Sequence, residues 1–380
     1  MPSDFQSKLG NTGTSIFAVM TQMANEYKAI NLSQGFPDFE VSAELVDLVN
    51  FYLQKGENQY APMAGVPLLR RAICQKAKNF QGLEYDPDTE VTVTVGATQA
   101  ISTAITTLVH PGDEVLVFEP AYDSYIPMVE LQGAKAVSIE LKAPLFLPDW
   151  DEVRRAVTSK TRAIIVNTPH NPCGSIFSLD DIDELASIVK EHDLYVISDE
   201  VYEHIVFDGS QHRSPASHPD LVDRTFIISS FGKTFHATGW KCGYCLAPEE
   251  LSREFRKVHQ FMVYSVCTPV QYAFAEFLQD EQNYLQVGAL YQQKRDFLIE
   301  ALVGSSFKLT AAAGSYFQLL DFSGFHTGSG VSLAEKLVKE KGVALIPLEP
   351  FYRDFKAPPY IRICFAKEDQ TLKSGINCLI

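Results

Sequence analysis

Short apolar runs alternate with longer helical patterns between residues 91 and 247, and no other property of the sequence limits the fold so strongly. The predicted strands are Val91–Val95, Glu114–Phe118, Ala163–Asn167, Tyr195–Asp199, Thr225–Ser229 and Gly243–Ala247. Helices are predicted between them at Thr98–Leu108, Ser124–Leu131 and Leu179–Glu191, the last with Ser178 as its N-cap. Strands that alternate with helices predict an α/β fold in which helices sandwich a mostly parallel sheet.

The pattern changes after about residue 280. There, helical patterns at Tyr284–Val303 and Ser332–Glu340 alternate with fewer predicted strands, at Tyr316–Asp321, Ala344–Leu348 and Tyr360–Phe365. We therefore expect a large domain over residues 46–280 and a smaller α+β domain over residues 281–380. Residues 1–45 look irregular, and we expect them to join the smaller domain or to reach onto a partner subunit.

Charge and hydropathy exclude several classes of function. The formal net charge of −15 disfavours a nucleic-acid surface, because neutralising phosphates requires clustered lysines and arginines. No run of about 18 apolar residues occurs, so we expect no contact with a membrane. Residues 1–4 also lack the basic and apolar pattern of a leader, and we expect a cytoplasmic protein.

The seven cysteines are scattered and odd in number, which is typical of reduced thiols rather than of a disulfide framework. Cys242 and Cys245 form a C-x-x-C pair within a predicted strand, but no second pair completes a zinc site. We therefore predict a structural role for both cysteines and no metal site.

Lys233 is the first candidate for chemistry. It lies in Ser229-Ser-Phe-Gly-Lys-Thr-Phe235, directly after a predicted strand and between two phenylalanines. Partial burial there would lower the pKa of its amine and make the amine a usable nucleophile. Taken alone the motif leaves alternatives open, because an ordinary surface lysine is commoner and Ser-x-x-Lys also occurs in serine acylases.

Asp199 ends another predicted strand, in Ile197-Ser-Asp-Glu-Val-Tyr-Glu203. Open α/β sheets bind ligands at the carboxyl ends of their strands, so Asp199 and Tyr202 are placed to meet a cofactor nitrogen and a neighbouring oxygen. The alternative for Asp199 is a plain helix N-cap.

Two turns complete the candidate set. Prolines and a glycine fix the path of Asn167-Thr-Pro-His-Asn-Pro-Cys-Gly174, so the Asn171 amide is able to point at a ligand. The turn Val95-Gly-Ala-Thr-Gln99 opens a helix with small residues and presents the free N–H groups of Ala97 and Thr98, which suits a phosphate. An ordinary turn is the alternative in both places.

Together these motifs resemble the class I aminotransferases of the aspartate aminotransferase superfamily, over nearly the whole chain. The motifs that occur in the family's order are Gln34-Gly-Phe-Pro-Asp38, Tyr60-Ala-Pro-Met-Ala-Gly65, Asn171-Pro-x-Gly174, Asp199-Glu-Val-Tyr202, Ser230-Phe-Gly-Lys233, Gly239-Trp-Lys241 and Arg362-Ile-Cys-Phe365. Within the superfamily the likeness is greatest to the glutamine transaminase K and kynurenine aminotransferase branch and to bacterial methionine aminotransferases. The resemblance implies fold type I and a pyridoxal 5′-phosphate cofactor.

The resemblance also implies a task for each matching position. Lys233 would carry the cofactor covalently and later move a proton from the substrate α-carbon. Asp199 would keep the pyridine nitrogen protonated, so that the ring is able to accept electrons. Tyr202 and Asn171 would bond the cofactor's phenolic oxygen, and Tyr122 would stack on its ring.

The cofactor phosphate would be held by the Ala97 and Thr98 amides with Ser230, Lys241 and, from the partner subunit, Tyr60. Lys241 departs from the arginine found in many relatives, and it supplies charge without a bidentate fork. The resemblance thus implies a homodimer in which the active sites are shared.

For the substrate, Arg362 would clamp the α-carboxylate with help from Asn171 and the Gly35 backbone. The alternative for Arg362 is a structural salt bridge on a strand. The residues placed around the substrate side chain are Phe17, Tyr125 and, across the dimer, Tyr264. Aromatic walls favour thioether, aromatic or uncharged amide side chains, although these three residues are equally well explained as core aromatics.

We therefore predict a pyridoxal-phosphate-dependent aminotransferase that takes an amino group from a neutral, thioether or aromatic L-amino acid to a 2-oxo acid. Two alternatives stay open. The same cofactor chemistry supports β-elimination of cysteine conjugates. The other alternative is a regulatory or assembly module that binds the cofactor without catalysing a reaction. A binding module would not require the Arg362 clamp, which disfavours it.

Overall fold

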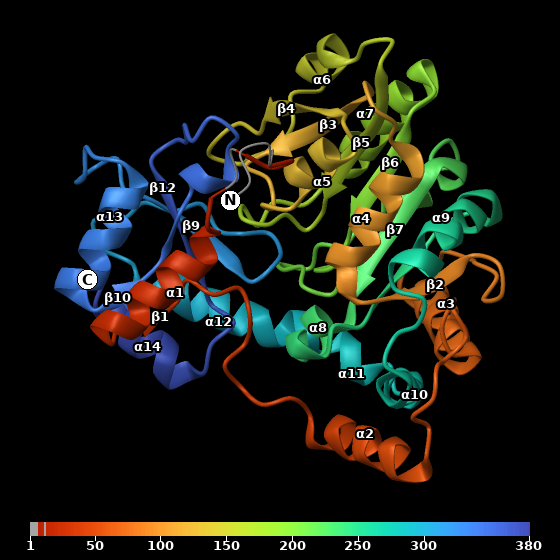
Figure 1. Ribbon diagram of the computed structural model, residues 1–380. Helices are drawn as coiled ribbons and strands as arrows, with labels where there is room; N and C mark the ends of the chain where they lie inside the picture. The colour runs from red at the N-terminus through yellow and green to blue at the C-terminus, as the bar shows by residue number, and fades with distance from the viewer. Residues whose placement is uncertain (1–6, 11–12) are drawn as a thin grey trace.

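The larger part of the molecule is built on a seven-stranded sheet, seen in the computed structural model, which describes residues 7–10 and 13–380 (Figure 1). In spatial order the strands are β2 (Val91–Thr94), β8 (Gly243–Leu246), β7 (Thr225–Ser230), β6 (Tyr195–Asp199), β5 (Thr161–Asn167), β3 (Glu114–Glu119) and β4 (Lys135–Glu140). Among the seven, β8 alone runs in the opposite direction to the other six. The predicted α/β fold with a mostly parallel sheet is confirmed.

All six strands predicted between residues 91 and 247 belong to this sheet, and each begins and ends within two residues of the predicted bounds. The strand that the prediction missed is β4. It lies at the sheet edge, pairs with β3, and carries exposed charged residues, Lys135 and Glu140, at its two ends. An edge strand needs fewer apolar residues, so it lacks the continuous run that marks the central strands.

Helices cover both faces of the sheet. The helices of this larger part are α2 (Ala43–Lys55), α3 (Pro67–Gln81), α4 (Gly96–Leu108), α5 (Tyr125–Leu131), α6 (Trp150–Ala156), α7 (Leu179–His192), α8 (Phe231–Thr234), α9 (Glu249–Met262) and α10 (Thr268–Phe277). Among them, α2 lies away from the sheet and packs on α10 (Figure 1). Successive residues of β5 show why both faces are apolar: Ile164 packs in the same cluster as α7, whereas Ile165 packs in the cluster that contains α4. The predicted cap of α7 is present, since Ser178 and Asp181 form a capping box.

The C-terminal part has two smaller sheets. An antiparallel one contains β11 (Ile346–Pro347), β12 (Tyr360–Cys364) and β9 (Phe317–Asp321), and a parallel pair joins β1 (Ile30–Asn31) to β10 (Val343–Ala344). The accompanying helices are α1 (Ile16–Tyr27), α12 (Val287–Ala301), α13 (Gly330–Lys336) and α14 (Asp369–Asn377). The short α11 (Gln282–Leu285) leads into α12, and its buried Tyr284 packs in the same cluster as α10. Figure 1 shows red α1 lying among these blue elements, so a helix from the start of the described chain packs with the C-terminal part.

Three details differ from the sequence predictions. The N-terminal segment is not wholly irregular, because α1 buries Met20 and Ala24 against the C-terminal elements. The helix expected at 284–303 is interrupted at Gln286, where Gly288 approaches the His204 carbonyl so closely that a Cβ would lie 3.1 Å from its oxygen. The strand expected at 344–348 divides between β10 and β11, which pair with different partners.

The division into domains at residues 45 and 280 stays a prediction. Part of the expected N-terminal arm, and the residues expected to lack a leader, lie outside the described residues. Across the residues that are described, none of the helices combines the length and the apolar character needed to cross a bilayer.

Candidate active site

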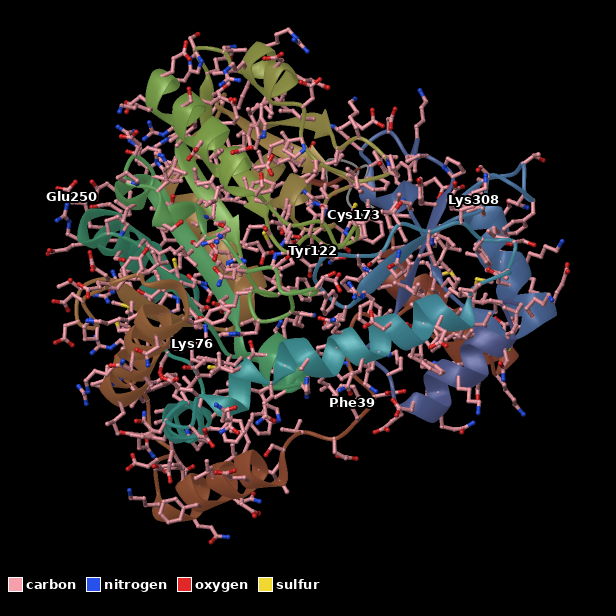
Figure 2. The ribbon with its side chains drawn as sticks, turned by 180° about the vertical axis from the view of Figure 1, so that it is seen from behind. Phe39, Lys76, Tyr122, Cys173, Glu250 and Lys308 are labelled. Atoms are coloured by element: carbon pink, nitrogen blue, oxygen red, sulfur yellow. The ribbon has the colours of Figure 1, made fainter. Side chains whose placement is uncertain are left out.

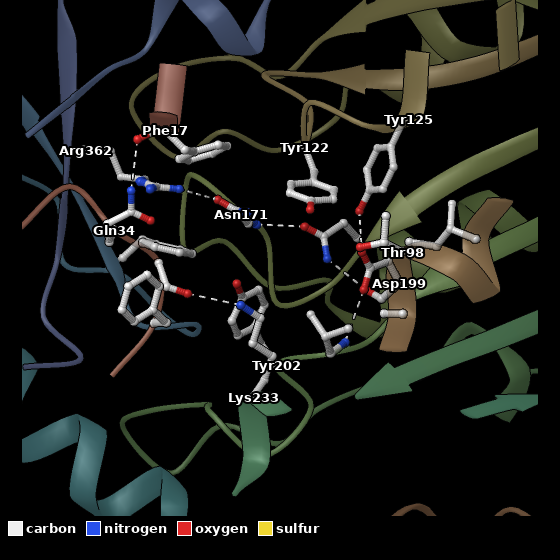
Figure 3. A pocket seen from close by; sticks show the side chains of 17 residues that line it. Phe17, Gln34, Thr98, Tyr122, Tyr125, Asn171, Asp199, Tyr202, Lys233 and Arg362 are labelled. Atoms are coloured by element: carbon white, nitrogen blue, oxygen red, sulfur yellow. Dashed lines mark hydrogen bonds between the residues drawn. The ribbon is translucent and has the colours of Figure 1, made fainter. Parts of the chain in front are cut away.

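A cavity of about 290 Å³ lies where β5, β6 and β7 end, facing the C-terminal sheet (Figure 3). Figure 2 places Tyr122 of its wall at the centre of the molecule, between the seven-stranded sheet and the C-terminal part. The cavity is lined by Phe17, Gln34, Gly35, Phe36, Ala97, Thr98, Ile101, Tyr122, Tyr125, Asn167, Asn171, Asp199, Val201, Tyr202, Lys233, Phe317 and Arg362. Parallel strands bring their carboxyl ends to one edge, so residues far apart in the sequence meet here.

Asp199 lies at the end of β6 and is buried. Its Oδ2 accepts a hydrogen bond of 2.5 Å from the Tyr125 hydroxyl, and its Oδ1 accepts one from the Val201 amide. Burial raises the pKa of the Asp199 carboxyl to about 6, and these two hydrogen bonds oppose the rise. Asp199 is therefore an anion near neutral pH and has no cation paired with it at hydrogen-bonding distance in the described chain.

Lys233 projects from α8, the short helix that follows β7. Its Nζ donates hydrogen bonds to the Gly35 carbonyl, at 3.1 Å, and to the Tyr316 hydroxyl, at 3.0 Å. Burial lowers the pKa of the amine to about 8. A substantial fraction is therefore neutral near pH 8, as a nucleophile or a base requires.

Arg362 lies on β12 and is 1% exposed. It donates to Asn171 Oδ1 and to the Ser33 carbonyl, both at 2.9 Å, and its guanidinium lies over the Phe317 ring at 3.9 Å from the centroid. Its Nε has no hydrogen-bond partner among the described residues. No carboxylate pairs with it, so the structural salt bridge considered as an alternative is absent from the described chain.

The Asn171 loop is fixed by hydrogen bonds within the chain. The Asn167 side chain makes both bonds: its Oδ1 accepts from the backbone N–H of Asn171 at 2.7 Å, and its Nδ2 donates to the backbone carbonyl of Asp199 at 2.9 Å. The loop thereby joins the end of β6 to the Arg362 guanidinium, as the dashed lines in Figure 3 show.

The small-residue turn opens α4 at Gly96, whose φ is +71°. A Cβ on Gly96 would lie 3.3 Å from Lys241 Nζ, and a Cβ on Gly243 would lie 3.0 Å from the Gly96 backbone. Ser230 is the register partner of Gly243. Lys241 and Ser230 therefore lie beside the turn that carries Ala97 and Thr98, although neither lines the cavity.

The predicted residues thus separate into three groups. Those that line the cavity are Phe17, Gly35, Ala97, Thr98, Tyr122, Tyr125, Asn171, Asp199, Tyr202, Lys233 and Arg362. Ser230 and Lys241 lie beside it. Tyr60 and Tyr264 do not line it: they are 83% and 49% exposed, and their rings meet edge to face at 5.5 Å.

Sequence reasoning missed several residues of the site, above all Tyr316, Asn167 and Gln34. Gln34 lines the cavity, and its side-chain amide donates to the Phe17 carbonyl at 2.9 Å. Asn167 offered a signal, since it is a polar residue that ends an apolar run. Tyr316 offered none, because its position beside Lys233 depends on a contact between residues 83 positions apart.

Comparison with known proteins agrees with this site. The family model of aminotransferase class I and II matches residues 27–379. Methionine aminotransferase of Escherichia coli is 46% identical over 375 residues, covering 98% of this chain and 97% of its own. Kynurenine–oxoglutarate transaminase 1 of mouse is 35% identical over 395 residues, covering 93% and 92%.

A solved Escherichia coli structure, described as identifying a methionine aminotransferase function, superimposes with a TM-score of 0.97 at 45% identity and covers 100% of this chain and 99% of that one. Fold, cavity and sequence agree over essentially the full length. The chain belongs to the class I and II aminotransferases, a family of pyridoxal-phosphate-dependent enzymes.

Proposed function

We propose that this aminotransferase takes its amino group from a neutral, thioether or aromatic L-amino acid, of the methionine, glutamine, phenylalanine, tyrosine or kynurenine type, and passes it to a 2-oxo acid. One observation carries the proposal: Lys233, Asp199 and Arg362 line a single cavity. They are an amine of lowered pKa, a buried carboxylate and a buried guanidinium with an unused N–H. Transamination requires all three, whereas cofactor binding alone would not require the guanidinium.

The residues present fit pyridoxal 5′-phosphate. Asp199 is a buried carboxylate that lacks a cation, and a pyridinium N–H would supply one. Tyr202 and Asn171 would bond the phenolic oxygen, and Tyr122 would stack on the ring. When bound, the cofactor supplies a carbonyl that binds amines and a ring that accepts the electron pair left behind by the α-proton.

The turn at the start of α4 suits the phosphate. The N–H groups of Ala97 and Thr98 lie in the first turn of a 13-residue helix, where the helix dipole favours an anion. We assign the remaining phosphate contacts to Ser230, Lys241 and the partner's Tyr60. Gly96 leaves room for the Lys241 amine, because a Cβ at position 96 would lie 3.3 Å from Nζ and would push it aside slightly.

Arg362 would bind the substrate α-carboxylate. Asn171 and Ser33 occupy part of its donor set and fix the plane of the guanidinium, while Nε is left unpaired. Each Nη nitrogen keeps a second N–H that neither Asn171 nor Ser33 takes, and a carboxylate that accepts from these two groups binds through charge-assisted hydrogen bonds. Gly35 completes this end of the cavity with its backbone.

Each of these groups then has a defined part in the reaction. Lys233 Nζ accepts the proton that leaves the substrate α-carbon and later gives it up, and its pKa of about 8 suits both roles near neutral pH. Asp199 stays ionised beside the ring nitrogen. Arg362 orients the α-carbon toward Lys233, because it fixes the carboxylate on the far side of the cavity.

The walls of the cavity favour an uncharged side chain. Arg362 is the only arginine among the lining residues, all of which are described, so a second carboxylate finds no bidentate partner there. Phe17 and Tyr125 supply aromatic surface, and we assign Tyr264 of a second copy to the same pocket. The methionine and kynurenine enzymes among its relatives support this choice of substrate.

We further propose a homodimer with shared sites, divided into domains near residues 45 and 280. Tyr60 and Tyr264 form an exposed aromatic pair that a second copy would bury, and Phe261, three residues before Tyr264, is 88% exposed. All seven cysteines are free thiols in the structure, which supports a reducing compartment such as the cytoplasm.

The proposal is tested by a panel of amino donors with several 2-oxo acids, measured as kcat/KM. We expect methionine and aromatic donors to exceed aspartate by at least about tenfold, because the carboxylate of aspartate would be buried unpaired. The first half-reaction must yield the matching oxo acid and leave the amino group on the cofactor. Release of pyruvate and ammonia from cysteine conjugates, without that amino form, would favour β-elimination instead.

A further inference from the structure

The amine of Lys233 is held by a closed ring of three hydrogen bonds. Lys233 Nζ donates to the Gly35 carbonyl at 3.1 Å and to the Tyr316 hydroxyl at 3.0 Å, and that hydroxyl donates to the same carbonyl at 2.6 Å. Two oxygens therefore fix the position of a nitrogen that ends a long, otherwise flexible side chain.

Tyr316 is itself held rigidly. It is fully buried, and its ring packs edge to face against Tyr202 at 5.1 Å and against Phe317 at 4.8 Å. Burial raises the pKa of the Tyr316 phenol well above its ordinary value, so the hydroxyl keeps its proton. It donates that proton to Gly35, and its lone pair is left for the Lys233 amine.

The Gly35 carbonyl is equally constrained. A Cβ on Gly35 would lie 2.9 Å from the Phe317 ring, so the backbone approaches this ring as only glycine allows. Two residues earlier, the Ser33 carbonyl accepts from Arg362 at 2.9 Å. One short segment therefore carries an acceptor for each of the two cations in the cavity.

We propose that Tyr316 is a positioning residue that forms, with the Gly35 carbonyl, a docking site for the Lys233 amine whenever that amine is not linked to the cofactor. This inference rests on the role proposed for Lys233. An amine that must take up a proton from the substrate gains rate when it waits at a fixed place rather than sampling rotamers. The docking site provides that place on the side of the cavity nearest Gly35.

Docking also affects the charge of the amine. Burial lowers the pKa of Lys233, Cys364 and Asp199 oppose this effect, and the cations Lys241 and Arg362 add to it. The Tyr316 and Gly35 oxygens accept hydrogen bonds from the amine and so favour its charged form. Removal of the Tyr316 hydroxyl should therefore lower the pKa of Lys233 further.

The chain offers a matched control in Tyr291. Its ring contacts that of Tyr316 at 5.4 Å and is also fully buried, but its hydroxyl has no hydrogen-bond partner among the described residues. Tyr316→Phe and Tyr291→Phe thus remove the same atom from the same aromatic cluster. A purely structural role predicts similar effects, and docking predicts an effect of Tyr316→Phe alone.

The measurement uses the full chain freed of cofactor. Pyridoxal phosphate is added across a range of pH, and the rate at which a borohydride-reducible link forms is followed, with peptide mapping to confirm its position. We expect the midpoint of the pH–rate curve to fall by roughly half a unit to one unit in Tyr316→Phe and to stay unchanged in Tyr291→Phe. In Tyr316→Phe with the cofactor bound, kcat should fall about tenfold while KM changes little.

Equal midpoints in both variants, with the link on Lys233, would overturn the docking role and leave the proposed function intact. A link on another lysine in the unaltered chain would instead overturn the assignment of Lys233. If Tyr316→Phe does not fold, 3-fluorotyrosine at position 316 keeps the shape and weakens the acceptor. A fall in its midpoint supports docking, and an unchanged midpoint contradicts it.

Discussion

Two parts of the proposed site differ in how completely one chain builds them. Asp199, Lys233 and Arg362 are enclosed, and each is hydrogen-bonded within the chain. Tyr60 and Tyr264 are assigned to the same reaction but lie on the surface, with no contribution to the cavity of their own chain.

Tyr60 and Tyr264 are nevertheless held in a fixed arrangement relative to each other. The segments that carry it are tied together, because Ser265 Oγ donates to the Ala61 carbonyl at 3.1 Å and Thr268 Oγ1 donates to the Gln59 carbonyl at 2.6 Å. The enclosed polar groups thus meet within one chain, whereas under the proposed homodimer Tyr60 and Tyr264 reach a cavity only in a second copy. The two parts should therefore respond differently to substitution and to dilution.

The largest effect is expected at Lys233. Lys233→Ala removes the nucleophile and base together, so turnover should fall to background while the fold is kept, as circular dichroism would show. Lys294→Ala is the control, because Lys294 lies outside the cavity and bonds the Lys367 carbonyl and Asp369. A cofactor found by peptide mapping on another lysine of the unaltered chain would show that the enclosed part has been misassigned.

Asp199→Ala should come next. Loss of the anion leaves the pyridine nitrogen without its partner, and we expect kcat to fall roughly a hundredfold or more, or about 2.8 kcal/mol at about 1.4 kcal/mol per tenfold. The reducible link to Lys233 should still form. Asp193→Asn, at an exposed ion pair with Arg224, serves as control. Near-normal turnover in Asp199→Ala would show that the Asp199 carboxylate does not act as the partner of the pyridine nitrogen.

Arg362→Lys tests whether Arg362 binds the substrate α-carboxylate. An ammonium cannot reproduce the fork that holds Asn171, Ser33 and a carboxylate at once, so KM for the amino donor should rise roughly tenfold to a hundredfold. Arg353→Lys is a matched control, since Arg353 also bonds a backbone carbonyl, that of Ala136, but outside the cavity. An equal change in both variants would indicate lost packing rather than lost recognition.

The smallest effect is expected at Tyr125, and it depends on pH. The Tyr125 hydroxyl lowers the pKa of Asp199, so Tyr125→Phe should raise that pKa above about 6. Asp199 is then protonated at a higher pH, and the acidic limb of cofactor binding should move upward. We expect a few-fold weaker binding at pH 6 and near-equal binding at pH 8, measured by titration with pyridoxal phosphate. Equal loss at both pH values would show that the hydroxyl acts through packing.

Most of the fold could be predicted because its central strands are continuous apolar runs. Where a strand is an edge, as at Lys135–Glu140, or a helix is only partly buried, as at Ile16–Tyr27, the pattern weakens and the element was missed. The helix break before Val287 lies two residues from a close approach of Gly288 to the His204 carbonyl, and that contact between distant segments has no local sequence pattern.

The candidate site was also predictable where a local sequence pattern marks the residue, and not where its position depends on contacts between distant segments. Asp199 and Asn171 could be predicted because each follows an apolar strand, and such strands share one edge of the sheet. Lys233 and Arg362 needed the family resemblance as well. The contact of Lys233 with Gly35, 198 positions away, and the Tyr125 bond to Asp199 could not be predicted, because they arise only when separate elements pack.

Subunit mixing tests most directly the claim that one enclosed part and one exposed part make a complete site. Lys233→Ala and Tyr60→Ala chains, each nearly inactive alone, are allowed to exchange. Half of the dimers would be mixed and each would have one intact site, so we expect about one quarter of the wild-type activity per chain. Mixtures that exchange but stay inactive, or an enzyme that is a monomer at assay concentration, would show that one chain builds the whole site.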